Sequence, residues 1–251
     1  MDTFARYNEN HRQEGTVFPM KKILKWTVLL VLAAAVFLVL GVVADGWKLY
    51  RNAVEARPVT EAVAAVQSDE HYTTLEQMPA LYPKAVVAVE DRRFYDHGGV
   101  DPIAVGRAVW TNLRTGTLAE GGSTLTQQLA KNLYFTQEKK FTRKVAEVFV
   151  AWDLERLYDK DEILELYINS IYYGDGYYGI YSASEGYFGK APADMTDYEC
   201  TLLAGVPNAP SVYAPTVNPD LAAQRQRQVV DSLVDTGDLT AQQAQDILAD
   251  S

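Results

Sequence analysis

Residues 90–132 read EDRRFYDHGGVDPIAVGRAVWTNLRTGTLAEGGSTLTQQLAKN, and the interpretation of the rest of the chain depends on them. They open with Glu90, which directly follows the apolar run at residues 85–89. Burial disfavours the charged form of a carboxylate, and a carboxylate at the end of a buried segment can act as a general acid or base near neutral pH. The sequence leaves one alternative open, in which Glu90 is only an ion-pair partner of Arg92 or Arg93.

Helix-capping signals and helical apolar spacing predict a mainly α-helical protein. Thr124 and Gln127, like Thr196 and Glu199, have the spacing of a capping box, and an Asp-Pro pair is typical of a helix start. Helix starts are predicted at Asp101, Thr124, about residue 142, Asp161 and Thr196, and two terminal helices are divided at residues 235–237.

Three further segments have a weaker or different signal. Residues 84–89 are too few for periodicity to distinguish a strand from a buried helix. The Tyr82-Pro83 pair disfavours helix at Tyr82, because the residue before proline avoids the α region. Residues 172–179, rich in glycine and tyrosine, are expected to form a loop. We find no series of alternating strands and no internal repeat.

Residues 26–44 contain no charged side chain and predict a membrane-spanning helix. At about 1.5 Å per residue this run approaches the ~30 Å of a hydrocarbon core. Lys21, Lys22 and Lys25 precede it, which predicts a cytoplasmic N-terminus and an extracytoplasmic remainder. The alternative is a cleaved signal peptide, whose apolar core is normally shorter, about 7–15 residues. The expected organisation is a cytoplasmic tail at 1–22, an anchor at 23–44, a linker at 45–71 and a catalytic domain at 72–251.

Composition excludes some classes of function. The chain of 251 residues has a formal net charge of −10, which argues against nucleic acid as a partner. It has one cysteine, Cys200, which we expect to be a small buried core residue. No HExxH or CxxC spacing is present, so the sequence shows no zinc site.

A basic cluster follows the Gly-Gly-Ser-Thr turn at residues 121–124. Its members are Lys131, Lys139, Lys140, Arg143 and Lys144, opposed only by Glu138. Residues 45–251 as a whole carry 18 basic and 30 acidic side chains, a net charge of −12. Lysine and arginine are the usual partners of phosphate oxygens, and the turn adds N–H groups at a helix start. The alternatives are a solvated surface and a simple pair between Arg143 and Glu147 one helical turn apart.

These stretches resemble the peptidoglycan glycosyltransferase family, the transglycosylase modules of class A penicillin-binding proteins and their monofunctional relatives. The resemblance covers about residues 72–219. It rests on four motifs, namely EDRRFYDHGG (90–99), GGSTLTQQLAKN (121–132), RKVAE (143–147) and ILELYIN (163–169), the last continuing through Gly174, Gly179 and YFGK (187–190).

The resemblance implies a lysozyme-like helical domain with a membrane-associated jaw subdomain. It implies that Glu90 is the catalytic base and Glu147 a second essential carboxylate, which would help position a divalent cation, Mg²⁺ or Mn²⁺. His97 is expected to be structural. The remaining implied assignments are pyrophosphate binding by Lys131, Lys139 and Arg143, and substrate binding by Ser123, Thr124, Gln127 and Gln128.

The implied reaction polymerises lipid II into glycan strands, with no organic cofactor. The implied partners are lipid II, the nascent glycan strand, the membrane and cell-wall synthesis proteins. The sequence shows no Ser-x-x-Lys or Lys-Thr-Gly motif, so we expect a monofunctional enzyme. A lysozyme-like or lytic enzyme and an inactive scaffold are the alternatives, and a pyrophosphate-binding cluster disfavours the first. The expected jaw candidates are Trp110, Leu113, Leu118, Leu133, Tyr134 and Phe135, and for Trp110 helical spacing favours a core position instead.

Overall fold

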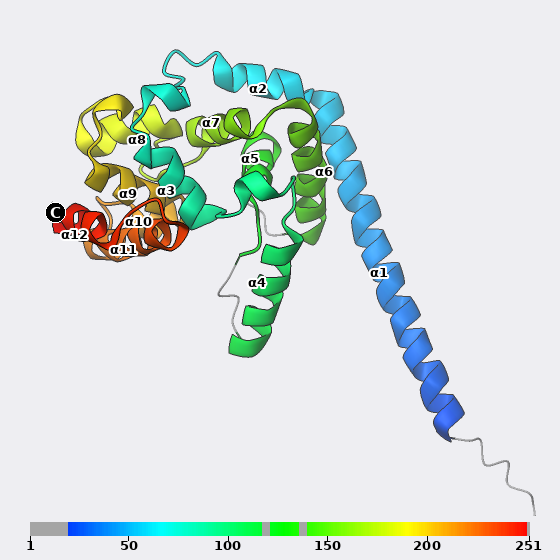
Figure 1. The fold of residues 1–251 in the computed structure, drawn as a ribbon. Coiled ribbons are helices and arrows are strands. Elements are labelled where there is room, and N and C mark those ends of the chain that lie inside the picture. The colour runs from blue at the N-terminus through cyan, green and yellow to red at the C-terminus, as the bar shows by residue number, and fades with distance from the viewer. Residues whose placement is uncertain (1–19, 117–120, 136–139, 250–251) are drawn as a thin grey trace, which may run out of the picture. The chain divides into compact units, whose positions relative to one another are not determined.

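The computed structural model describes residues 20–116, 121–135 and 140–249. These residues form helices joined by short loops, and no strand occurs among them beyond an isolated bridge between Tyr172 and Tyr178 (Figure 1). The prediction of a mainly α-helical fold is confirmed. The α-helices are α1 (Met20–Ala56), α2 (Val59–Gln67), α3 (Leu81–Glu90), α4 (Pro102–Thr115), α5 (Leu125–Tyr134), α6 (Phe141–Leu157), α7 (Lys160–Ser170), α8 (Gly179–Phe188), α9 (Asp197–Gly205), α10 (Pro210–Tyr213), α11 (Pro219–Thr236) and α12 (Ala241–Ala249). Four 3₁₀ turns are η1 (Leu75–Gln77), η2 (Phe94–Asp96), η3 (Pro192–Asp194) and η4 (Val206–Asn208).

The chain divides into two compact units, Met1–Ala44 and Asp45–Ser251. Within the described part, α1 contains the one helix segment, Lys22–Ala56, that is long and apolar enough to cross a membrane. Most of the tail expected at 1–22 lies outside the described residues. Residues 45–71, expected as a linker, are mostly helical. They complete α1 and form α2, which buries Val59, Ala62 and Val63.

Local capping chemistry explains where five of the α-helices begin, namely α4, α5, α7, α9 and α11. Thr124 and Thr196 close the predicted capping boxes of α5 and α9. Asp101 accepts a hydrogen bond from the amide of Ile103 and is followed by proline at the first position of α4. Gly237 adopts a left-handed conformation (φ 82°) that ends α11, as glycine does readily.

Two local predictions were wrong. The N-cap of α7 is Asp159 and not Asp161, because the Asp159 carboxylate accepts the amide of Glu162 while the Glu162 side chain returns to the Asp159 amide. Tyr82 and Pro83 lie inside the first turn of α3. Proline is tolerated there because the first-turn N–H groups have no intrahelical partner.

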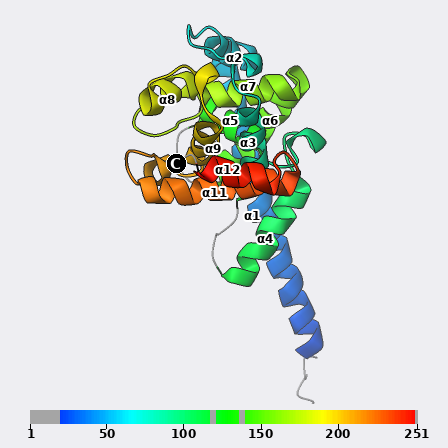
Figure 2. The same ribbon diagram turned by 60° about the vertical axis from the view of Figure 1, so that its left-hand side comes forward.

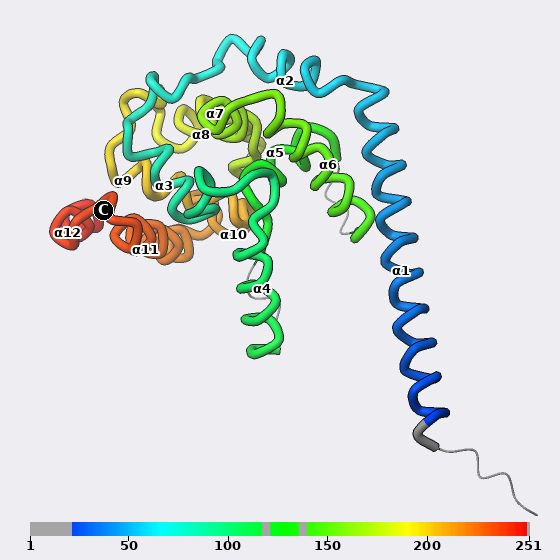
Figure 3. The backbone as a smooth tube through the Cα atoms, turned by 45° about the vertical axis from the view of Figure 1, so that its right-hand side comes forward, coloured from blue at the N-terminus to red at the C-terminus, as the bar shows by residue number. Residues whose placement is uncertain are grey.

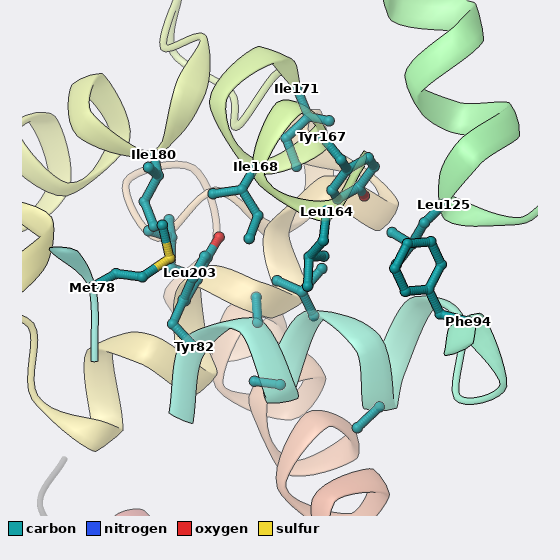
Figure 4. Packing of buried hydrophobic residues seen from close by; sticks show 14 of the residues in the cluster. Met78, Tyr82, Phe94, Leu125, Leu164, Tyr167, Ile168, Ile171, Ile180 and Leu203 are labelled. Atoms are coloured by element: carbon teal, nitrogen blue, oxygen red, sulfur yellow. The ribbon is translucent and has the colours of Figure 1, made fainter. Parts of the chain in front are cut away.

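The hydrophobic core includes α3 and α7, and Figure 4 shows part of it. In this view Phe94 and Leu125 lie on one side, and Met78, Tyr82 and Ile180 on the other. α3 packs against α9 and α11, and α5 packs against α6 and α7. Tyr82 is fully buried and shares a hydrogen bond with the hydroxyl of Tyr173 (O–O 2.6 Å). Because α3 packs into this core, its last residue, Glu90, is held at a fixed place between α5 and α11, beside Gln128 and Arg225.

α4 projects from the helical body in all three overall views (Figures 1, 2 and 3). Only Ala108 of this helix is buried. Trp110 and Leu113 are 69% and 76% exposed, so the core position that spacing favoured for Trp110 is wrong. Leu118 lies outside the described residues. The other jaw candidates, Leu133, Tyr134 and Phe135, are half-buried and pack against the core.

The close approach of Gly46 to α6 yields a stability prediction. A Cβ at this position would lie 2.5 Å from Cβ of Val145 and 2.9 Å from the carbonyl oxygen of Thr142. Gly46→Val should therefore lower the melting temperature of the detergent-solubilised chain, because overpacking costs about 1–3 kcal/mol. The matched control is Gly41→Val in the same helix, since nothing lies within 4 Å of a Cβ there. Equal melting temperatures for the two variants would contradict this packing.

Candidate active site

A hydrogen-bonded joint at Asp91 fastens the end of α3 to the start of α5. Oδ2 of Asp91 accepts the amide of Leu125 (3.0 Å), and Oδ1 lies 2.8 Å from Nε2 of His97. Thr124 adds a second fastening, because its hydroxyl donates to the carbonyl of Gly99 (2.8 Å). The loop after Glu90 and the first turn of α5 are thus held together, and His97 contributes by holding Asp91.

Glu90 is held by two elements that are far apart in the sequence. Its side chain is 7% exposed, with Oε2 accepting a hydrogen bond from Nε2 of Gln128 (2.9 Å) and Oε1 lying 3.5 Å from Nη2 of Arg225. The alternative partners are engaged elsewhere. Arg92 pairs with Asp235 (3.6 Å), and Arg93 pairs with Asp101 (3.0 Å). The interpretation of Glu90 as their ion-pair partner is therefore wrong.

Tyr167 fixes the orientation of Gln128. Its hydroxyl donates to Oε1 of Gln128 (3.3 Å), which leaves the amide nitrogen pointing at Glu90. Burial raises the pKa of Tyr167 well above its ordinary value, so the hydroxyl keeps its proton and remains a donor. This buried tyrosine therefore determines which atom of Gln128 faces the carboxylate.

Two cavities meet at Glu90. One has a volume of about 450 Å³ and the other about 350 Å³, and both are bordered by Val89, Glu90, Gly121 and Ser123. The larger is also lined by Gln127, Gln128, Lys131, Arg143, Lys144, Glu147, Pro207, Asn208 and Arg225. The smaller is also lined by Ala88, Asp91, Arg92, Arg93, Asp101, Ala104, Arg107, Gly122, Thr124 and Ser232.

The larger cavity brings together most of the residues expected from the sequence. It contains Glu90 and Glu147, the basic residues Lys131 and Arg143, and the polar residues Ser123, Gln127 and Gln128. Thr124 lines the smaller cavity, and Lys139 lies outside the described residues.

Three of the polar residues are engaged in holding the site together. The Thr124 hydroxyl accepts the amide of Gln127 (3.1 Å) while donating to Gly99, so its hydrogen is committed. Gln127 is buried, and its Oε1 accepts the amide of Thr124 (3.3 Å). Ser123 accepts a hydrogen bond from Nζ of Lys144 (2.6 Å), which ties the glycine turn to α6.

Glu147 neutralises two cations on its own helix. It is 2% exposed and lies 3.2 Å from Nε of Arg143 and 3.0 Å from Nζ of Lys144. Removing one partner of a buried pair leaves an uncompensated charge, at a cost of about 3–5 kcal/mol. The predicted pair between Arg143 and Glu147 is thus present, within a larger cluster.

Lys131 is the exceptional cation of this cluster. Among the residues that the structure describes, its half-buried side chain forms no hydrogen bond or ion pair. Burial lowers the pKa of Lys131, and the Arg143 and Lys144 charges lower it further, while Glu147 and Glu90 partly oppose the change.

The described lining of the larger cavity holds four cationic and two acidic side chains, an excess of two positive charges. A partly dehydrated cavity with this charge favours an anionic ligand.

The residues around Glu147 do not fit a resident divalent cation. Glu147 shares its surroundings with Lys131, Arg143 and Lys144, whose charges repel a metal ion. Within the described ranges, the one group of three potential ligands is Asp91, His97 and Asp101. The Asp101 oxygens accept from Arg93 and Ile103, and the Asp91 oxygens contact Leu125 and His97. The oxygen and nitrogen atoms that would coordinate a metal ion in this group already form hydrogen bonds within the protein.

Sequence reasoning missed Arg225 and the role of Tyr167. Arg225 lies 135 positions after Glu90, in the run QRQRQ of α11, and no local spacing connects the two. Tyr167 lies in the ILELYIN motif, and its place in the predicted helix indicated only a buried core residue. Its hydroxyl was the available signal, since a buried tyrosine usually finds a hydrogen-bond partner.

The transglycosylase family model matches residues 56–234. This chain belongs to the transglycosylase family. Penicillin-binding protein 1F of Bacillus subtilis (strain 168) is 42% identical over 184 residues, 73% of this chain and 26% of that protein. Penicillin-binding protein 1A of Neisseria flavescens is 46% identical over 172 residues, 68% of this chain and 22% of that protein. This transglycosylase chain spans about a quarter of the length of these relatives. The crystal structure of penicillin-binding protein 1A from Haemophilus influenzae is similar with a TM-score of 0.35 and 25% identity, covering 49% of this chain and 15% of that one.

The lowered pKa of Lys131 predicts a gain of stability when its charge is removed. Folding lowers the pKa of Lys131, so the charged lysine reduces the free energy of unfolding. This reduction is complete at pH values below the pKa of the folded state. It disappears as the pH rises past the higher pKa of the unfolded state. Lys131→Met should therefore raise the melting temperature at pH 7, and the difference from wild type should shrink at alkaline pH. The control is Lys48→Met, because that side chain is exposed and its ion pair is long. A melting temperature of Lys131→Met below that of wild type would contradict the interpretation.

Proposed function

We propose that this transglycosylase polymerises lipid II into glycan strands. The supporting observation is a single cavity that holds a buried carboxylate, Glu90, beside an excess of cationic side chains. A glycosyl transfer from a lipid pyrophosphate needs both parts, a base for the attacking hydroxyl and positive charge for the leaving group. A glycan-cleaving enzyme needs carboxyl groups but no pyrophosphate site.

Glu90 is the base in this proposal. The 4-hydroxyl of the acceptor GlcNAc loses its proton to the Glu90 carboxylate as its oxygen attacks C1 of the donor MurNAc. The bond between C1 and the pyrophosphate oxygen breaks, and the configuration at C1 inverts. Gln128 and Arg225 support this role because they fix the carboxylate while leaving lone pairs for the proton.

The basic cluster stabilises the departing undecaprenyl pyrophosphate. Charge accumulates on the phosphate oxygens as the bond to C1 breaks, and cations already in place stabilise it without reorganisation. Arg143 and Lys144 are preorganised by Glu147, whereas Lys131 has no other partner among the described residues. Pyrophosphate would supply Lys131 with a direct ion-pair partner, in a cavity where cationic side chains outnumber acidic ones.

The position of Glu90 between two cavities supports separate donor and acceptor sites. The donor pyrophosphate fits the larger cavity because Lys131, Arg143 and Lys144 line it. The acceptor then occupies the smaller cavity, lined by Arg93, Arg107 and the glycine turn, so that its hydroxyl reaches Glu90 from the other side. The nascent strand grows as the donor and lipid II enters as the acceptor.

The apolar run at residues 26–44 supports a single-pass anchor with a cytoplasmic N-terminus, because lysines precede the run. Residues 45–251 would then face outward, where lipid II is polymerised. Protease added to intact protoplasts should digest this part. Protection of residues 45–251, with cleavage of the N-terminal tail instead, would reverse the orientation.

The exposed apolar side of α4 supports a second contact with the membrane. Its exposed large apolar side chains are Ile103, Val105, Val109, Trp110 and Leu113. An exposed apolar patch of this kind marks an interaction surface. With the other three tryptophans replaced by phenylalanine, Trp110 in the liposome-reconstituted chain should be quenched by brominated lipids more strongly than by acrylamide. Stronger quenching from the aqueous side would contradict the membrane contact.

Glu90→Gln tests the proposed chemistry. The amide does not accept a proton, so lipid II turnover should fall by about 10²–10⁴-fold. The fold should persist, because the amide retains the shape of the side chain. Glu185→Gln is the matched control, since Glu185 is exposed on α8. Turnover of labelled lipid II, with a thermal melt of each variant, is the measurement. More than about a tenth of wild-type turnover in Glu90→Gln would contradict the assignment, because loss of a general base costs more than this.

A further inference from the structure

We propose that Arg225 of α11 positions Glu90 for proton transfer. Gly205 of α9, which has no side chain, leaves the space in which the arginine side chain lies. This inference rests on the proposed function, since it concerns the base of that reaction. It assigns a role in the reaction to the C-terminal part of the chain, which lies outside all the sequence segments that suggested catalysis.

The two oxygens of Glu90 are held from opposite parts of the chain. Gln128 of α5 donates to Oε2, and the Arg225 guanidinium lies against Oε1. A carboxylate held at one oxygen alone still rotates about its terminal bond, because such torsions are broad. Hydrogen-bonding partners on two different helices fix the plane of the carboxylate and so determine where its remaining lone pairs point. Arg225 itself is only 13% exposed, so water competes little for the contact.

The guanidinium of Arg225 is held by two further hydrogen bonds and lies near an aromatic ring. Nη1 donates to Oε1 of Gln228 (2.9 Å), and Nε donates to the carbonyl of Gly205 (3.4 Å). The guanidinium carbon lies 6.0 Å from the ring centre of Tyr213. An arginine held in this way is already ordered before the substrate binds, so little conformational entropy is lost in the reaction. It can therefore keep the Glu90 carboxylate in one orientation.

Gly205 provides the space in which the arginine lies. A Cβ at this position would lie 2.9 Å from Cγ of Arg225, closer than side chains approach. Its backbone angles, φ −80° and ψ −24°, are open to any residue, so conformation does not require glycine here. The requirement is steric and concerns Arg225. Gly205→Ala therefore displaces the guanidinium without removing its charge.

Kinetic constants and stability together distinguish positioning from two other roles of an arginine. A purely structural arginine would affect folding and not the turnover of the folded protein. An arginine that binds substrate equally in ground and transition states would affect KM and leave kcat unchanged. An arginine that aims the base lowers kcat, because misplacing a reacting group by about 1 Å costs about 10²-fold.

The test measures kcat, KM and the melting temperature of the full chain with lipid II. Arg225→Met keeps the aliphatic stem, and Gly205→Ala moves the guanidinium. Both should lower kcat, Arg225→Met by about 10²-fold, with little change in KM. The control for the arginine is Arg227→Met, an exposed arginine on the same helix. The control for the glycine is Gly106→Ala, another helical glycine, where nothing lies within 4 Å of a Cβ.

Chemical rescue keeps the test decisive if a variant loses stability. Millimolar guanidinium should restore part of the kcat of Arg225→Ala, whereas urea at the same concentration should not. Wild-type kcat in Arg225→Met would overturn the inference, as would a rise in KM alone. Loss of stability in Arg225→Met without rescue of Arg225→Ala would also overturn it, in favour of a structural role. A wild-type chain that does not polymerise lipid II would instead refute the proposed function.

Discussion

The joint at Asp91 is the constraint on which the arrangement of the site depends. α3 must end at Glu90 for the carboxylate to leave the core, and α5 must begin close by for Gln128 and Lys131 to reach the same cavity. One carboxylate meets both needs by accepting the amide of Leu125 at the positive end of α5. A charged acceptor suits this place, because hydrogen bonds to ionised groups are about twice as strong as neutral ones.

The same joint extends to α4 through the Arg93–Asp101 pair. Asp101 caps α4 and accepts two hydrogen bonds from Arg93, each 3.0 Å long. Burial alone would raise the pKa of Asp101, but Arg93 and the helix amides outweigh it, and the pKa is lowered. The projecting helix is therefore held by a charged pair that begins three residues after Glu90, so the exposed apolar surface of α4 and the site share one rigid connection.

The basic cluster contains one cation, Lys131, that has no hydrogen bond or ion pair among the described residues. Glu147 neutralises Arg143 and Lys144, but Lys131 is left half-buried with a lowered pKa. Such an arrangement opposes the ordinary rule that buried charges are paired. Violations of this kind are expected at functional sites, where a ligand supplies the missing partner. In the proposed reaction that partner is the pyrophosphate.

The sequence by itself determined the helical class, the starts of four helices, and most of the basic and acidic residues that line the larger cavity, with Arg225 the exception. These follow from local chemistry, since a capping box or an Asp-Pro pair acts within a few residues. Tertiary structure decided what touches Glu90. Arg92 and Arg93 are its neighbours in sequence but pair elsewhere, whereas Arg225 and Gln128 reach it from α11 and α5. It also decided that Trp110 is exposed and that Gly205 seats an arginine. These facts depend on which helices pack together, and contacts across long sequence separations leave no local pattern.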